Sequence, residues 1–334
     1  MKKIRFLNFI KFISFSIIAV ILISCTCSIL ERKSYYSPWN YMGKLNEFYS
    51  LPKESLEYIC VGASHAYCTV NPLEIWNETG IKGFVLATQQ QPLKASYYYI
   101  KEAFKTQKPK VVILEGIGAA ITEYDEGALY DCIDPLKPSF NKLSMINSLV
   151  KGSGSEAYYF NFIKYHSRWK ELDKDDIKGF LKPEYDTYKG FVPLNSDFKS
   201  ANQIPDYSSI TPKAIPEENL ETLNDIYQLV KDNDAELVLM IAPYDVEKYG
   251  GIFKSEKLWA SENNVKVVDF TIMLEQLNID PDKDYVDSAH LDISGAAKTS
   301  KYLSVFLKSF NLTTDTNDAE WFSDYKKYLE TAEF

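Results

Sequence analysis

The sequence predicts an α/β protein, a three-layer α/β/α sandwich built around a parallel sheet of five strands. Five short apolar runs are continuous rather than alternating, which is typical of strands that are covered on both faces. Helical periodicity separates most of these runs, and strands that alternate with helices favour a parallel sheet. With 334 residues, 46% of them hydrophobic and 25% charged, the chain can form one such domain with an insertion, or two smaller domains.

The predicted strands and helices alternate through residues 56–310, which we interpret as the body of the protein. The strands are residues 56–62, 84–88, 110–115, 236–243 and 265–270. Helices are predicted around residues 73–80, from Pro92 to about residue 106, at residues 218–233, and from an N-cap at Ser294 to about residue 310.

Residues from about 117 to 215 do not follow this alternation. They are rich in Tyr, Lys, Asp, Gly and Pro, and they contain one predicted helical piece at residues 157–169. Because they come between strands three and four, they are placed to cover the carboxyl ends of the strands, where open α/β sheets bind ligands. We interpret them as a lid or acceptor-binding insertion, with a peripheral decoration as the alternative. Residues 31–55 are predicted as a polar linker, and residues 311–334 as an acidic tail or a loosely packed helix.

The N-terminal 30 residues are a predicted membrane segment. A basic start precedes the apolar residues 12–30, a run about long enough to cross a bilayer as a helix. Basic flanks stay cytoplasmic, which places everything after residue 30 outside the cell membrane. Residues 22–25, Leu-Ile-Ser-Cys, resemble a bacterial lipobox in which Cys25 is lipidated after cleavage, and an uncleaved signal anchor is the alternative. Either way, we expect an extracytoplasmic protein tethered to the bacterial cell membrane.

The acidic composition argues against nucleic acid as a partner. The net charge is −9, and the N-terminal segment has four cations and no acid, so the rest of the chain carries −13. Such a body repels phosphate backbones, and no basic stripe offsets it. The chain has three histidines, and the cysteines after residue 30 lack the spacing of metal ligands, so neither a metal site nor a cofactor is expected.

Ser64 is the first candidate for chemistry. The run Val-Gly-Ala-Ser-His at residues 61–65 places this serine at the carboxyl end of the first predicted strand and at the start of a helix. Free N–H groups and the helix dipole at such a place favour an oxyanion. A serine that starts a helix is also a common N-cap, so this observation alone is weak.

Asp287 and His290 form the second candidate, in a loop before the last predicted helix. An Asp three residues before a His can hold the imidazole through Nδ1, which leaves Nε2 to accept a serine proton. An Asp-x-x-His sequence also occurs by chance and can merely cap a turn. The two candidates support each other only if the fold brings them together.

Together the two blocks resemble the SGNH (GDSL-type) hydrolase superfamily, a group with a flavodoxin-like sheet. Gly-Ala-Ser at residues 62–64 occupies the position of Gly-Asp-Ser, and Asp287 to His290 the position of the C-terminal block. The resemblance covers roughly residues 56–116 and 217–310 and omits the insertion. It implies a catalytic triad of Ser64, His290 and Asp287.

The sequence departs from the superfamily at the oxyanion donors. The resemblance implies a Gly after strand two and an Asn after strand three. The Gly position falls near Gln90, where a backbone N–H can still serve, and Leu-Glu-Gly-Ile-Gly at residues 114–118 contains no Asn. The third donor is therefore either missing or replaced by a side-chain amide of Gln89, Gln90 or Gln91.

The anchor, the Gly-x-Ser-His sequence and these departures look most like the surface acyl-transfer branch. That branch includes the D-alanyl transfer protein of teichoic-acid synthesis and O-acetyltransferase-like proteins of exopolysaccharide assembly. The resemblance implies an acyl esterase or O-acyltransferase that acts through an acyl-Ser64 intermediate. Its partners would be a cell-surface polysaccharide or teichoic-acid-like polymer, the membrane, and a membrane protein as acyl donor. The alternative is a non-catalytic binding or assembly protein of the cell envelope with the same fold.

Two further groups of polar residues are candidates for binding. His65 follows the nucleophile, and a structural role is favoured because His290 already has an orienting acid. In the insertion, His166 and Arg168 precede Trp169, and this combination suits an anionic or sugar acceptor. A surface helix with an amphipathic Trp is the alternative.

Overall fold

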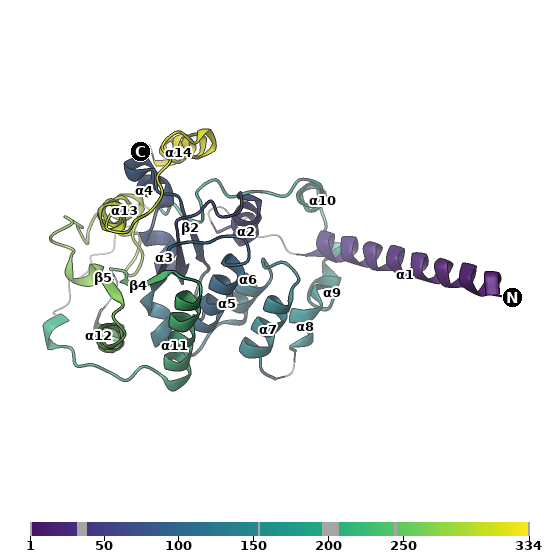
Figure 1. Ribbon diagram of the computed structural model, residues 1–334, viewed down its shortest axis with the longest axis horizontal. Coiled ribbons are helices and arrows are strands. Elements are labelled where there is room, and N and C mark those ends of the chain that lie inside the picture. The colour runs from purple at the N-terminus through teal and green to yellow at the C-terminus, as the bar shows by residue number, and fades with distance from the viewer. Residues whose placement is uncertain (1, 32–38, 153, 196–206, 244–245, 333–334) are drawn as a thin grey trace.

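The computed structural model describes residues 2–31, 39–152, 154–195, 207–243 and 246–332 (Figure 1). Its centre is a sheet of five parallel strands in the order β2-β1-β3-β4-β5. The strands are β1 (Tyr58–Gly62), β2 (Gly83–Ala87), β3 (Val111–Glu115), β4 (Glu236–Ile241) and β5 (Lys266–Asp269). This order is that of flavodoxin-like folds, in which ligands bind at the switch point beside the carboxyl ends of the two central strands. The predicted α/β/α fold is confirmed.

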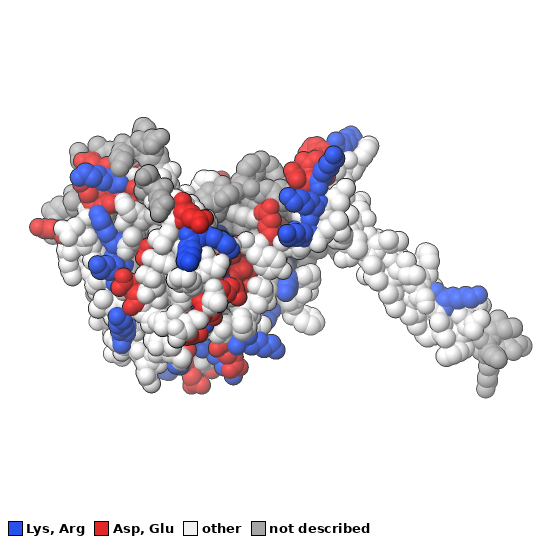
Figure 2. All heavy atoms as spheres, turned by 90° about the horizontal axis from the view of Figure 1, so that it is seen from above, with Lys and Arg blue, Asp and Glu red and all other residues white. Residues whose placement is uncertain are grey.

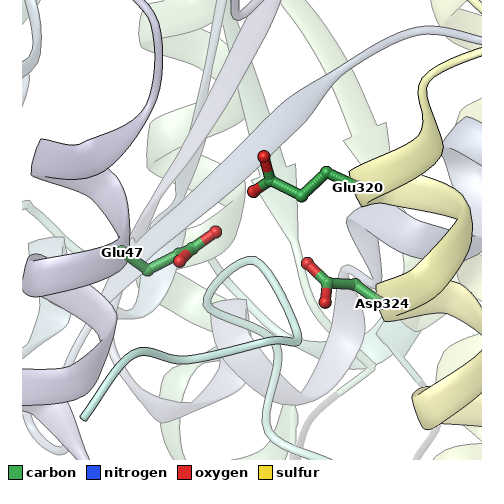
Figure 3. A group of neighbouring side chains, drawn as sticks. All are labelled: Glu47, Glu320 and Asp324. Atoms are coloured by element: carbon green, nitrogen blue, oxygen red, sulfur yellow. The ribbon is translucent and has the colours of Figure 1, made fainter.

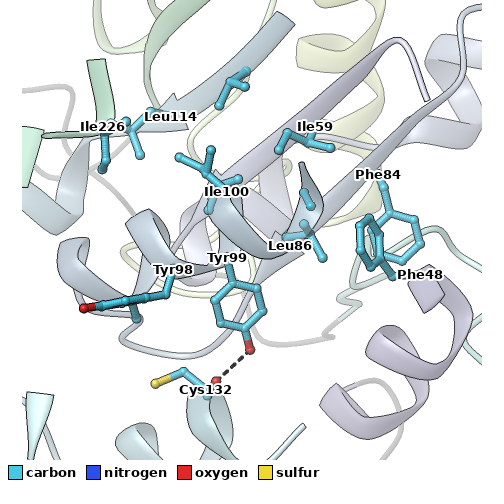
Figure 4. Packing of buried hydrophobic residues seen from close by; sticks show 14 of the residues in the cluster. Phe48, Ile59, Phe84, Leu86, Tyr98, Tyr99, Ile100, Leu114, Cys132 and Ile226 are labelled. Carbon is cyan, nitrogen blue, oxygen red and sulfur yellow. Dashed lines mark hydrogen bonds between the residues drawn. The ribbon is translucent and has the colours of Figure 1, made fainter. Parts of the chain in front are cut away.

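Helices cover both faces of the sheet, which explains why the strands are continuous apolar runs. All residues of β1, β2 and β3 are buried. The covering helices are α3 (Ser64–Thr69), α4 (Pro72–Thr79), α5 (Leu93–Ala103), α11 (Glu217–Asp232), α12 (Val246–Glu262) and α13 (Ile293–Leu307). Figure 4 shows the packing on one face, where Phe84 of β2 contacts the ring of Phe48 edge-on at 5.5 Å between centroids.

Two details of these helices differ from the prediction. The closing helix α13 is capped by Asp292, whose carboxylate accepts a hydrogen bond from the Gly295 N–H at 2.9 Å, and not by Ser294. The Ser294 hydroxyl lies 2.7 Å from carboxylate oxygens of both Asp284 and Asp292, so it supports the cap instead of forming it. Helix α12 is absent from the prediction because two consecutive glycines at residues 250–251 disfavour a helix.

The insertion is more helical than its composition predicts. It contains α6 (Glu126–Ile133), α7 (Phe140–Leu149), α8 (Glu156–Tyr159), α9 (Asn161–Tyr165) and α10 (Lys174–Leu181), and the 3-10 turns η1 (Gly116–Ala120), η2 (His166–Lys170) and η3 (Tyr207–Ser209). The predicted single helix at residues 157–169 is therefore three short pieces. Helix α7 packs on α5, where the Asn141 amide donates to the Tyr98 carbonyl, while α9, η2 and α10 contact the N-terminal helix. The lid remains a prediction, and residues 196–206 lie outside the described residues.

Both flanking segments belong to the folded body rather than to a linker or a loose tail. Within residues 31–55, α2 (Tyr41–Ser50) buries Leu45 and Phe48 against the sheet. Within residues 311–334, α14 (Ala319–Ala332) buries Trp321 against the ring of Trp76, with 5.9 Å between centroids. Helix α14 exposes a charged face, whereas α2 buries its two charged residues, Lys44 and Glu47, so the composition of neither segment reveals its packed side.

The N-terminal segment is one helix, α1 (Lys2–Leu30), that projects from the body (Figure 1). Its residues Arg5–Leu30 contain an 18-residue window with a mean hydropathy of 2.5, and they are long and apolar enough to cross a membrane. Side chains are mostly exposed up to Ser24 and become partly or fully covered between Cys27 and Leu30. A buried core helix is thereby excluded, whereas membrane anchoring and the lipidation of Cys25 stay predictions.

Candidate active site

Ser64 lies at the carboxyl end of β1 as the first residue of α3. The last residue of β1, Gly62, is a glycine because no side chain fits at that position. A Cβ on Gly62 would lie 2.6 Å from Cβ of Glu115 on the neighbouring strand, which is well inside van der Waals contact. The chain then turns through Ala63, and the Ser64 side chain ends 8% exposed at the sheet edge.

Asp287 and His290 are held in a tight loop between β5 and α13. The loop is closed by an antiparallel bridge between Tyr285 and Leu291. One carboxylate oxygen of Asp287 accepts hydrogen bonds from the backbone N–H groups of Ala289 and His290, at 2.7 and 2.8 Å. This local turn is what the Asp-x-x-His spacing builds, because an Asp side chain readily bonds to the backbone two and three residues later.

The fold brings the two candidate blocks into contact. Nε2 of His290 lies 2.8 Å from Oγ of Ser64, and Nδ1 lies 2.9 Å from Oδ2 of Asp287. Helix α13 fixes this meeting, since the Thr299 hydroxyl donates to the Thr69 carbonyl and the Asn71 N–H donates to the Ser300 hydroxyl. These distances are those of a serine nucleophile, a base and an orienting acid.

The carboxylate of Asp287 is electrostatically suited to orient the imidazole. Partial burial raises its pKa, but the hydrogen bond and charge of His290 and the two backbone N–H groups outweigh this and hold the pKa at about 2. Asp287 therefore stays ionised at any working pH and favours the tautomer with a proton on Nδ1 of His290.

His65 packs directly against this imidazole. The two rings are stacked, with 4.9 Å between centroids and 10° between planes. Burial, followed by the charge of His290, lowers the pKa of His65 to about 3, so its ring is neutral. This placement agrees with the structural role favoured by the sequence.

Two buried carboxyl groups lie behind the nucleophile and are not predicted from the sequence. Glu115 ends β3, and its Oε1 accepts a hydrogen bond from the Ile117 N–H at 2.9 Å. Burial raises the pKa of Glu115 to about 8, despite the opposing effect of the N–H groups of Ile117 and Ala63. Glu256 of α12 lies against Gly116, where an added Cβ would be 2.9 Å from Oε2.

The pKa of Glu256 is raised for the same reason as that of Glu115. Burial, then the charges of Glu115 and Asp269, raises the pKa of Glu256 well above its ordinary value. Glu115 could have been noticed in the sequence, because it is the one acid that ends an otherwise apolar strand at the edge where Ser64 lies. Glu256 carries no such signal, since its position depends on how α12 packs.

The two predicted oxyanion residues have different surroundings. Gln90 has a left-handed backbone with φ 48°, which suits the place where the resemblance implies a glycine. Its side-chain amide donates to Asp125 at 3.2 Å. Gln91 is fully buried, and its amide nitrogen donates to the Ser96 hydroxyl and the Leu86 carbonyl. The side-chain amide of Gln91 is thus used within the fold, and the backbone of this loop is the better candidate donor.

The structure does not bring the predicted acceptor residues to Ser64. His166 and Arg168 lie in η2, which contacts α1, and in Figure 1 the neighbouring α9 lies at the opposite end of the body from α13. The Arg168 guanidinium donates to the Leu30 carbonyl at 2.8 Å and to Asp176 at 2.9 Å. Nδ1 of His166 lies 2.8 Å from the Ile163 carbonyl. Their acceptor-binding role stays a prediction without a structural link to the nucleophile.

Three carboxylates elsewhere in the described residues are close enough to hold a metal ion, those of Glu47, Glu320 and Asp324 (Figure 3). Nζ of Lys189 lies 2.6 Å from Glu47, 2.8 Å from Asp324 and 3.4 Å from Glu320. The ammonium group takes the place that a cation would need. This cluster ties α2, the end of the insertion and α14 together.

The comparisons with known proteins give a few distant structural similarities. No family profile matches the sequence, and no curated protein matches it. The chain is similar to a Bacteroides fragilis protein named provisionally as an acylhydrolase, with a TM-score of 0.37 and 9% identity over 83% of this chain and 99% of that one. It is also similar to a gut microbial diltiazem-metabolizing enzyme, with a TM-score of 0.38 and 13% identity over 77% of this chain and 47% of that one. At such scores the similarities carry no argument about activity, which rests on the geometry of Ser64, His290 and Asp287.

Proposed function

We propose that this chain is a serine-dependent acyl esterase or O-acyltransferase that acts on cell-surface carbohydrate through an acyl-Ser64 intermediate. One observation carries the proposal. Ser64, His290 and Asp287 form a continuous hydrogen-bonded chain, with 2.8 Å from the hydroxyl to Nε2 and 2.9 Å from Nδ1 to the carboxylate. Ser64 and His290 are 226 residues apart in sequence, and the fold brings them into contact. A serine hydrolase requires this contact between nucleophile and base.

The reaction would proceed in two halves. Oγ of Ser64 attacks the carbonyl carbon of an acyl ester while its proton passes to Nε2 of His290. The ester C–O bond then breaks, the leaving alcohol takes that proton, and the acyl group remains on Ser64. In the second half, water or a sugar hydroxyl gives its proton to Nε2 of His290 and attacks the acyl carbon. The bond between the acyl carbon and Oγ then breaks, and His290 returns the proton to Oγ, which restores the Ser64 hydroxyl. Asp287 keeps the imidazole oriented throughout.

The choice of a surface carbohydrate follows from the anchor. The apolar helix α1 would hold the body at the outer face of the cell membrane, where polysaccharides and teichoic-acid-like polymers are the abundant hydroxyl acceptors. An acyl donor protein in the membrane would be a natural partner for a tethered enzyme. Two points support this choice. The helix α1 is long and apolar enough to be an anchor, and an acyl-serine can transfer its acyl group to any sugar hydroxyl.

A second candidate function is a binding or assembly protein without turnover. It is favoured by the absence of an Asn from residues 114–118, where the resemblance implies a donor, and by the engaged amide of Gln91. Removal of one oxyanion donor costs roughly 10²–10³-fold in rate, so a defective oxyanion site can leave a folded but inactive protein.

Labelling with a serine-reactive fluorophosphonate separates the two candidates. The enzyme should be labelled, Ser64→Ala should not, and Ser261→Ala on the exposed side of α12 serves as the matched control. We expect slow hydrolysis of small acetyl esters that is lost in Ser64→Ala, and faster turnover when the correct carbohydrate is added. Fast hydrolysis that no glycan accelerates would leave a plain esterase. Wild-type protein that is neither labelled nor active would favour the binding protein.

The type of anchor is tested by Cys25→Ala, with Cys27→Ala as the matched control two residues away. Loss of lipid labelling and of processing in Cys25→Ala alone indicates a lipoprotein. Unchanged size and membrane retention in both variants indicates an uncleaved helix. A soluble cytoplasmic pool of the wild-type protein would contradict both versions.

A further inference from the structure

Three elements of the insertion surround the outer end of α1. Helices α9 and α10 lie on opposite sides of that end in Figure 1, and η2 also contacts α1. We call residues 161–181, which comprise these elements, the collar. The collar is attached by Arg168, whose guanidinium bonds to the carbonyl of Leu30 and to Asp176 of α10. The collar therefore binds α1 at the point where this helix leaves the body.

The collar carries an unusual number of exposed apolar side chains. Trp169 is 65% exposed and Leu181 is 74% exposed, although residues of these types are commonly buried in soluble proteins. The other large exposed apolar residues of the collar are Phe162, Ile163 and Ile177. An apolar group gathered on adjacent elements marks an interaction surface.

The length of the apolar run determines where the collar lies relative to the bilayer. Residues 12–30 span about 28 Å as a helix, which matches the roughly 30 Å hydrocarbon core of a bilayer. Lys11 then lies at the inner boundary and Leu30 at the outer one. Because Arg168 binds the carbonyl of Leu30, the collar lies at the level of the outer headgroups.

The charge of the collar also differs from that of the rest of the chain. It has five basic and four acidic residues, a net charge of +1, in a chain whose net charge is −9. Figure 2 shows α1 as white over most of its length, with mixed charges gathered on the body near its end. An acidic surface is repelled by anionic lipid, whereas a nearly neutral surface with Trp and basic residues suits the interface.

We propose that the exposed apolar side chains of the collar enter the headgroup boundary of the outer leaflet around α1. This rests on the membrane anchoring that the proposed function assumes, and it goes beyond it, because the body gains a second attachment and a fixed orientation. Trp169, Ile177 and Leu181 would lie at the acyl boundary, and Arg168 and Lys170 at the phosphates.

Quenching of tryptophan emission by bromine-labelled acyl chains tests this. Full-length protein is reconstituted in phosphatidylcholine vesicles with or without brominated lipid. We expect brominated lipid to reduce the emission, and this loss to be absent in Trp169→Phe. Phe322→Trp, made in the Trp169→Phe background at an exposed position of α14 outside the collar, is the matched control and should add emission that brominated lipid does not reduce. A second variant, Leu181→Asp, should weaken the quenching because a carboxylate stays in water.

Each other outcome overturns the proposal. If brominated lipid does not reduce the emission of the wild type, and aqueous iodide quenches Trp169, the collar faces water. Protection of Trp169 from both quenchers would mean that a second copy of the chain covers the collar. Hydrolysis of a small soluble ester is measured on the same vesicles. If the wild-type protein does not hydrolyse this ester, the result counts against the proposed function and leaves the collar result intact.

Discussion

The imidazole of His65 is stacked on that of His290, with 4.9 Å between ring centroids and 10° between planes. His290 gains a proton during each half of the proposed reaction. The pKa of His65 is lowered to about 3, which keeps the His65 ring neutral. A neutral aromatic face can support a cationic imidazole without repelling it, so we interpret His65 as a positioning residue.

Replacement of His65 separates positioning from chemistry. His65→Phe preserves an aromatic face and should keep kcat within about tenfold of wild type. His65→Ala removes the support and should lower kcat by up to about 10²-fold through misplacement of the base. Steady-state ester hydrolysis and fluorophosphonate labelling are the measurements. If His65→Phe is as inactive as Ser64→Ala, His65 takes part in the proton transfers.

Asp287→Asn should lower kcat by about 10⁴-fold while the protein stays folded. An Asn can still accept the two backbone N–H groups of the loop, but it cannot hold the imidazole in the correct tautomer. The free energy of unfolding should change by less than about 1 kcal/mol, because the carboxylate is half exposed. Asp282→Asn, an exposed residue of the same loop region, is the control for both measurements. A variant with near wild-type kcat would remove Asp287 from the mechanism.

The low pKa of Asp287 also determines how it affects stability with pH. A carboxyl group whose pKa falls on folding stabilises the fold above its unfolded pKa, and this contribution disappears as the pH falls through the folded value, about 2. Loss of activity between about pH 4 and 6 should therefore not come from Asp287, and the acid limb of the rate profile should report another group.

Glu115→Gln should stabilise the protein at alkaline pH. Folding raises the pKa of this carboxyl from about 4.5 to about 8, so the folded state binds more protons than the unfolded state in that interval. Stability therefore falls as the pH rises between these values, and the neutral amide removes that slope. Denaturant unfolding at pH 5 and pH 8 should show a gain on the order of 1–3 kcal/mol at pH 8 only. Glu236→Gln, at the exposed start of β4, should show none, and equal slopes in all three proteins would contradict a protonated Glu115.

Lys189→Met should destabilise the fold by about 3–5 kcal/mol, since it removes the lysine that Glu47 and Asp324 share and leaves Asp324 with Lys327 alone. Although burial opposes the charge on Lys189, these acids raise its pKa, so the lysine contributes its stability below pH 10.5. Lys266→Met, which breaks an exposed pair with Glu236, should cost at most about 1 kcal/mol. Calorimetric melting of both variants is the measurement. Equal small losses would mean that the cluster is not needed for the fold.

The sequence predicts the sheet well because its strands are buried on both faces and their apolar runs are unambiguous. It also predicts that Ser64 and His290 can meet, since both follow strands whose carboxyl ends share one edge. It fails where packing decides the outcome. Phe48 lies on a helix whose Lys44 and Glu47 are buried, and Trp321 on a helix with a charged outer face, so the polar composition of both segments resembles that of a linker and a tail. Glu256 reaches the site only through the placement of α12, and Arg168 suits an acceptor in the sequence but binds Leu30 in the fold.

The Lys189 cluster joins residue 47 to residue 324, so the body closes on itself only when almost the whole chain is present. If the body crosses the membrane as an extended polymer, beginning with the residues that follow α1, Lys189 emerges long before its partner Asp324. Export must therefore deliver an incomplete body that waits for its last helix. Such a protein depends on factors that protect unfolded chains outside the membrane, and a stalled or truncated export product would be an early target for surface proteases.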